Sequence, residues 1–107
     1  MSLHYTQSDV LEWLDQSALV LRDILGQSQV KPEISDVVRQ EFSSKLRIVS
    51  GVVSFLARQE QEGHLTSGDG AIMPEEERPH LLERLSEIRS LALSVADVLR
   101  SRIAVLN

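Results

Sequence analysis

Apolar residues recur every three or four positions along three long stretches of this sequence, and two breaks containing glycine and proline separate the stretches. Because an α-helix turns once every 3.6 residues, this spacing gathers the apolar side chains on one side of each helix. The breaks are a short one between Gly26 and Pro32 and a long one over residues 63–79. The sequence therefore predicts an all-α fold, an antiparallel bundle of three long helices that forms a single domain over residues 1–107. The predicted helices span about residues 7–26, 32–62 and 79–106.

The first predicted helix has clear start and stop signals. Thr6 can cap its N-terminus, and Asp9, three residues later, completes a capping box. Gly26 is expected to end the helix, because glycine readily takes the left-handed conformation found after helix C-termini. The expected apolar stripe consists of Leu11, Leu14, Ala18, Leu21 and Leu25.

The second predicted helix begins at Pro32, a residue suited to the first turn of a helix. A glycine inside a helix costs up to about 1 kcal/mol relative to alanine. Two alternatives therefore stay open, a continuous helix or a break near Ser43-Ser44 or Gly51 that would produce four helices. The stripe of the second helix consists of Ile34, Val38, Phe42, Leu46, Val49, Val53 and Leu56. The stripe of the third consists of Leu81, Leu85, Ile88, Ala92, Val95, Leu99, Ile103 and Leu106.

Each helix also carries apolar residues beside its main stripe, and a three-helix bundle would leave part of them in water. Large exposed apolar patches usually mark interfaces. We therefore expect a partner interface that serves self-association as a homodimer, an amphipathic helix of a protein partner, or both. In the alternative, the second helix breaks and a four-helix monomer buries these residues. The predicted interface residues are Trp13, Val20, Ile24, Val37, Ile48, Phe55, Leu91, Val98 and Val105.

Serine recurs on one side of the second helix and on one side of the third. Small side chains in such a row allow helices to approach closely, or they form an ordinary solvated face. The serines concerned are Ser43, Ser50 and Ser54 on the second helix and Ser86, Ser90, Ser94 and Ser101 on the third.

Residue types that carry chemistry are few in this chain. It has no cysteine, and its histidines, His4, His64 and His80, are not spaced as metal ligands on a helix. The only glycine-rich element, residues 68–70, lacks the lysine and the strand of a phosphate-binding loop. We expect no catalytic, cofactor-binding or metal site.

Charge and hydropathy narrow the partners further. The net charge of −5 disfavours general binding to nucleic-acid phosphates. No apolar run is long enough to span a membrane, and the N-terminus has no secretory signal pattern, so the expected location is the cytoplasm. The predicted function is a non-enzymatic protein–protein interaction module, such as an adaptor, small chaperone or regulator. The alternative is a dimeric nucleic-acid-associated transcriptional regulator.

The long break before the third helix has two interpretations. In the first, residues 66–70 are mobile, while Ile72 and Met73 anchor the segment as a cover over the bundle. In the second, the segment is only a connector.

Overall fold

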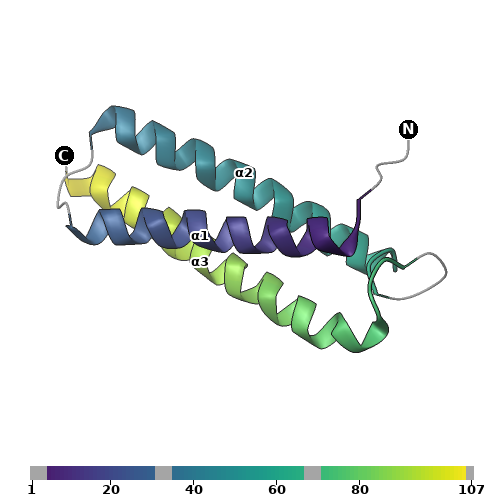
Figure 1. Ribbon diagram of the computed structural model, residues 1–107. Coiled ribbons are helices and arrows are strands. Elements are labelled where there is room, and N and C mark those ends of the chain that lie inside the picture. The colour runs from purple at the N-terminus through teal and green to yellow at the C-terminus, as the bar shows by residue number, and fades with distance from the viewer. Residues whose placement is uncertain (1–4, 31–34, 67–70, 106–107) are drawn as a thin grey trace.

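The computed structural model of the chain describes residues 5–30, 35–66 and 71–105, with side chains in all of these except 29–30 and 101–105. Within this part the chain is helical and contains no strand, which confirms the predicted all-α fold with three long helices packed against each other. Figure 1 shows the arrangement. The elements are α1 (Gln7–Val30), α2 (Asp36–Gln61), the short 3-10 turn η1 (Glu75–Glu77) and α3 (Arg78–Val105).

The three helices lie side by side along the long dimension of the molecule, which measures 54 × 29 × 19 Å (Figure 1). Every pair of helices is in contact, and α1 packs more extensively against α3 than against α2. The hydroxyl of Tyr5, just before α1, donates a hydrogen bond to Oε1 of Gln59 near the end of α2, at 2.9 Å. Because all three helices contact one another, they enclose one hydrophobic core, to which each contributes buried residues.

The core follows the predicted stripes of the second and third helices closely. Phe42, Val49, Val53 and Leu56 are buried on α2. On α3 the buried residues are Leu81, Leu85, Ile88, Val95 and Leu99. The side chains of Ile34, Ile103 and Leu106 lie outside the part that the structure describes.

The predicted stripe of the first helix is wrong at both ends. Leu11 is 38% exposed and Leu25 is only partly buried, whereas Val10 and Ile24 are fully buried. The core side of α1 includes two serines, Ser17 and Ser28, which periodicity based on apolar residues alone leaves out. Burial of Ser28 is possible because its hydroxyl donates a hydrogen bond to the Ile24 carbonyl at 2.8 Å. The buried side of the helix is therefore rotated from the predicted one.

Helix boundaries agree with the sequence only in part. The capping box is present, since Thr6 Oγ1 accepts from Asp9 N and Thr6 N donates to Asp9 Oδ2. The predicted end at Gly26 is wrong, because α1 continues to Val30 and Gly26 keeps a helical conformation in open space.

The second helix begins later than predicted and is continuous. Ser35 is its N-cap, and the Ser35 hydroxyl accepts a hydrogen bond from Val38 N at 3.3 Å. Pro32, the predicted start, lies outside the described residues. Gly51 sits within α2 with nothing near the position of a Cβ, so the predicted alternative of a broken helix and four helices is wrong.

The segment between α2 and α3 is tied to the bundle at both of its described ends. Gly63, with φ of 80°, turns the chain out of α2. Leu65 and Met73 are buried, and Met73 N donates to the Leu65 carbonyl at 2.9 Å. Thr66 is also buried, and its hydroxyl donates a hydrogen bond to Glu60 Oε1 at 2.6 Å. Residues 67–70 lie outside the described part, so the expected mobility of residues 66–70 stays a prediction.

Candidate functional site

Several of the predicted interface residues meet on the side of the bundle formed by α1 and α2. Trp13 and Phe55 lie with ring centroids 6.4 Å apart, and Tyr5 contacts both at 5.6 and 5.7 Å. All three rings are partly buried against the core. Tilted and edge-to-face geometries such as these are the favourable ones for aromatic rings. The aromatic cluster therefore holds α1 to α2 within the chain.

The same side continues into solvent along α2. Ile48 is 68% exposed and Val37 is 75% exposed. They precede Phe55 by seven and eighteen residues, spacings that keep them on the same side of the helix. Val20, two turns after Trp13 on α1, is partly buried. We call this surface the aromatic face; it comprises Tyr5, Trp13, Val20, Val37, Ile48 and Phe55.

The remaining predicted interface residues do not belong to the aromatic face. Ile24 is fully buried in the bundle, where no partner can reach it. Leu91 and Val98 are partly buried on α3. The side chain of Val105 lies outside the described residues. The nine residues therefore do not form one continuous surface.

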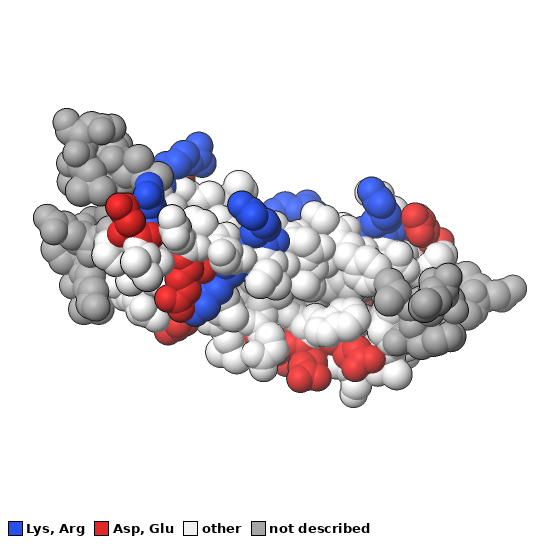
Figure 2. All heavy atoms as spheres, turned by 90° about the horizontal axis from the view of Figure 1, so that it is seen from above, with Lys and Arg blue, Asp and Glu red and all other residues white. Residues whose placement is uncertain are grey.

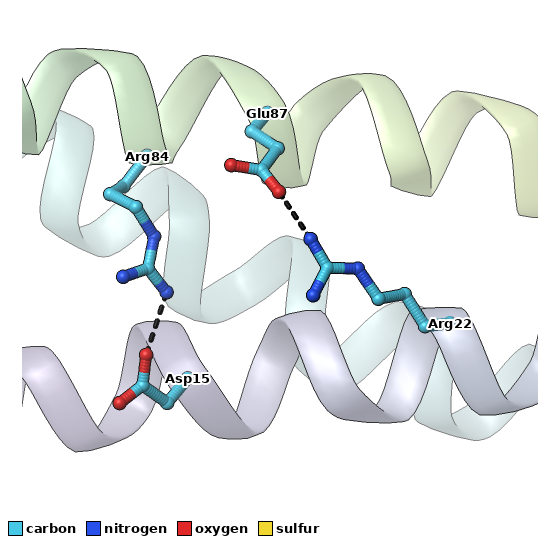
Figure 3. Close-up of polar contacts among 4 residues, drawn as sticks. All are labelled: Asp15, Arg22, Arg84 and Glu87. Carbon is cyan, nitrogen blue, oxygen red and sulfur yellow. Dashed lines mark hydrogen bonds and ion pairs between the residues drawn. The ribbon is translucent and has the colours of Figure 1, made fainter.

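Leu91 follows Glu87 by one helical turn, so both lie on the side of α3 that faces α1. Ion pairs cross between the helices here, as Figure 3 shows. Arg84 Nη2 on α3 lies 2.7 Å from Asp15 Oδ1 on α1, and Arg22 on α1 pairs with Glu87 on α3. Exposed pairs of this kind contribute at most about 1 kcal/mol each. The two pairs bridge α1 and α3 on the side of α3 on which Leu91 lies.

The opposite side of α3, toward α2, is open. A hollow of about 260 Å³ lies between the two helices, with an apolar floor that includes Leu46, Val53 and Ala92. A second hollow of about 340 Å³ follows toward the end of α2, and Arg89 lines both. We call the two hollows together the α2/α3 groove. Its other lining residues are Ser50, Ser54, Ala57, Glu60, Gln61, Arg78, Leu82, Leu85, Ser86, Leu93 and Ala96.

The apolar periodicity of the sequence does not predict this groove, although the serine rows contain one signal for it. Ser50, Ser54 and Ser86 belong to the serine rows on the second and third helices, and all three line the groove. Their small side chains, with the nearby alanines, leave the space between α2 and α3 unfilled. Ser90 and Ser94 are exposed and do not line it. Only part of the serine pattern therefore marks the groove.

A buried carboxylate stands at the end of the groove. Glu60 Oε1 accepts a hydrogen bond from Thr66 Oγ1 at 2.6 Å and lies 3.2 Å from Arg78 Nε. The other oxygen, Oε2, is buried without a hydrogen-bond partner. Burial of a carboxylate is costly unless it is paired, and Arg78 supplies the opposite charge. This contact joins the end of α2 to the start of α3.

The other titratable groups of the described residues include two exposed histidines and a partly buried tyrosine. Nδ1 of the exposed His64 lies 3.1 Å from Gln59 Oε1, and His80 is exposed on α3. No group of three His, Asp or Glu side chains in the described residues could hold a metal ion. The pKa of Tyr5 is raised above 10.0 by burial and by the nearby charge of Glu62. A tyrosine that keeps its proton in this way acts as a hydrogen-bond donor, here to Gln59.

The candidate site is thus a pair of apolar surfaces, the α2/α3 groove and the aromatic face. Within the part of the chain that the structure describes, no helix has the length and apolar content needed to cross a membrane. No family model, curated protein or solved structure matches this chain.

Proposed function

We propose that this chain is a non-enzymatic protein–protein interaction module, an adaptor, small chaperone or regulator, which binds an amphipathic helix in the α2/α3 groove. The observation that carries the proposal is the groove itself. Its apolar floor stays open to solvent between two long helices that both also pack against α1. In a four-helix bundle this position is taken by the fourth helix.

The dimensions of the groove suit a helix of ordinary length. It extends from Leu46 to Gln61 on α2, which corresponds to about 22 Å at 1.5 Å per residue. A partner helix of about 15 residues covers that distance. Such a helix presents apolar side chains at positions i, i+3, i+4 and i+7, and these can enter the spaces beside Ala92 and Ala96. Leu93, 63% exposed at the rim, would be covered in the complex.

The test compares two substitutions of the same kind on different sides of the chain. Ser54→Tyr fills the groove with a bulky neutral group, and Ser90→Tyr adds the same group on an exposed part of α3 outside it. Proteins retained from a native cell extract by the wild type should be lost with Ser54→Tyr and kept with Ser90→Tyr. Retention of the same proteins by both variants would refute the groove as the binding site.

We also propose that the chain forms a homodimer through the aromatic face, in addition to binding a partner helix in the groove. The exposed pair Val37 and Ile48 supports it, because a twofold axis would place each residue against apolar residues of the second copy. Sedimentation should give a dimer for the wild type and a monomer for Ile48→Asp. A monomeric wild type at high micromolar concentration would rule out the dimer and leave the groove proposal intact.

We also propose that the helices alternate in direction, as in an antiparallel bundle. The hydrogen bond from Tyr5, before α1, to Gln59, near the end of α2, supports opposite directions for these two helices. A spin-label pair at Thr6 and Glu62 should therefore give a much shorter distance than a pair at Thr6 and Asp36.

A further inference from the structure

Three arginines on α2 and α3 differ from the other described cations of the chain. Arg22, Arg39, Lys45, Arg78, Arg84 and Arg100 each pair with a carboxylate. Among the described Lys and Arg side chains, only Arg47, Arg58 and Arg89 make no ion pair. A cation without an internal carboxylate is free to meet an external one.

Of these three arginines, Arg89 lines the groove, whereas Arg47 and Arg58 lie beside it on α2, beyond the groove-lining Ser54. Arg89, on α3, lines both hollows. Arg47 and Arg58 lie seven residues before and four residues after Ser54, a groove-lining residue, so all three share one side of α2. The distance along α2 from Arg47 to Arg58 is about 16 Å. The unpaired positive charge thus extends over several helical turns.

Of the acidic side chains on this side, Glu62, exposed one turn after Arg58, offsets part of that charge, and the others are paired. Asp36 and Asp97 are paired with Arg39 and Arg100, and Glu60 is buried against Arg78. Figure 2, which looks down on the side where α2 lies in Figure 1, shows most visible basic groups along one edge and most visible acidic groups toward the other. The charge around the groove is therefore positive although the whole chain carries −5.

Because dissolved salt screens exposed charges, a ligand at the groove interacts mainly with the charged side chains close to it. Interactions between exposed charges fall off over about 8 Å at physiological ionic strength. The molecule is 29 Å and 19 Å across in its two shorter dimensions. Carboxylates on the far side therefore contribute little to what an approaching ligand experiences at the groove.

We infer that the occupant of the α2/α3 groove is an acidic amphipathic helix of a partner protein, with an apolar stripe between flanks of Asp and Glu. This inference rests on the proposed function and adds the chemistry of the partner. The apolar stripe fits the floor of Leu46, Val53 and Ala92. One acidic flank meets Arg89 in the groove, and the other reaches past Ser54 to Arg47 and Arg58 on α2. Ion pairs across the rim select the partner, while burial of the stripe supplies most of the affinity.

A nucleic-acid ligand fits the same surface less well. The exposed Leu93 and Leu82 stand among the arginines, and a phosphate backbone gains nothing from covering them. The combination of an apolar floor and nearby arginines therefore favours a peptide helix.

Labelled synthetic helices of about 18 residues test the inference directly with the full chain. One carries a leucine stripe with glutamate flanks, the second the same stripe with lysine flanks, and the third the acidic composition with the stripe scrambled. At low salt the acidic amphipathic peptide should bind roughly ten-fold more tightly than the basic one, because several exposed ion pairs act together. The preference should shrink at high salt, and the scrambled peptide should not bind.

Matched variants locate the charge effect. Arg89→Gln and Gln16→Glu each lower the net charge by one, the first in the groove and the second on the exposed side of α1. Binding of the acidic peptide should weaken by a few-fold with Arg89→Gln and stay unchanged with Gln16→Glu. The triple variant R47E/R58E/R89E should prefer the basic peptide. Thermal melting by circular dichroism verifies that each variant is folded.

The outcomes separate this inference from the proposed function. Equal affinity for acidic and basic peptides would overturn the acidic partner and leave helix docking standing. If neither amphipathic peptide bound, helix docking itself would be overturned. If duplex DNA bound more tightly than the acidic peptide and depended on Arg89, this face would be assigned to nucleic acid, as in the alternative of a transcriptional regulator.

Discussion

The two sides of α3 are built differently, although they share one helix and one buried centre. Toward α1, large side chains such as Ile88 and Val95 are fully buried and two ion pairs bridge the helices. Toward α2, the lining includes Ser86, Ala92 and Ala96, and hollows remain. On α3, large apolar side chains thus fill the space toward α1, whereas serine and alanine leave hollows toward α2.

The largest difference between the two sides should appear in truncations to alanine. Leu14 is fully buried on α1, so Leu14→Ala should lower the free energy of unfolding by about 2–5 kcal/mol through lost burial and a residual cavity. Leu93→Ala at the groove rim should change it by less than about 0.5 kcal/mol. Urea unfolding of both variants measures the two values. Similar losses would mean that the groove is closed in solution.

Replacing an alanine by a larger residue also distinguishes the packed core from the open groove, because only the groove has space for the added side chain. Ala18 is buried in the core, and Ala18→Leu should destabilise the chain by about 1–3 kcal/mol because no space is available. Ala96→Leu should be close to neutral, since the hollow beside Ala96 accepts the added volume. A large loss of stability for Ala96→Leu would contradict an open groove.

A double-mutant cycle on Asp15 and Arg84 measures what the ion pairs add to the closed side. The coupling energy should be about 0.2–1 kcal/mol and should fall with added salt, because both side chains reach solvent. A coupling that did not respond to salt would show that the pair is more buried than the structure indicates.

The contact between α1 and α2 should show the smallest effect, as a pH dependence. The raised pKa of Tyr5 means that the folded chain keeps a proton which the unfolded chain loses near pH 10. The stabilisation is therefore fully present below pH 10 and is lost as the pH rises through the folded pKa. Tyr5→Phe should remove this part of the alkaline decline in melting temperature. An identical decline in both proteins would refute the assignment to Tyr5.

Periodicity in the sequence was sufficient for the helices and for most of the core, because α2 and α3 bury apolar residues almost throughout their stripes. It failed on α1, where the buried Ser17 and Ser28 interrupt the apolar pattern. The predicted helix end at Gly26 was also wrong. A glycine inside a helix costs only about 1 kcal/mol relative to alanine, and the packing of neighbouring turns of α1 offsets that cost. The groove could not be predicted, because a hollow depends on which side chains face each other across two helices.

The backbone hydrogen bond between Met73 and Leu65 has a consequence for engineering the chain. Leu65 and Met73 are buried and joined at 2.9 Å, so the bundle fixes where the chain departs and where it returns. Lengthening the chain between them leaves that span unchanged, and each doubling of loop length adds only about 0.6 kcal/mol of closure entropy. A fluorescent or affinity sequence inserted after Gly68 is thus expected to be tolerated. Such an insertion provides a reporter at the end of the bundle while the surfaces along its length stay native.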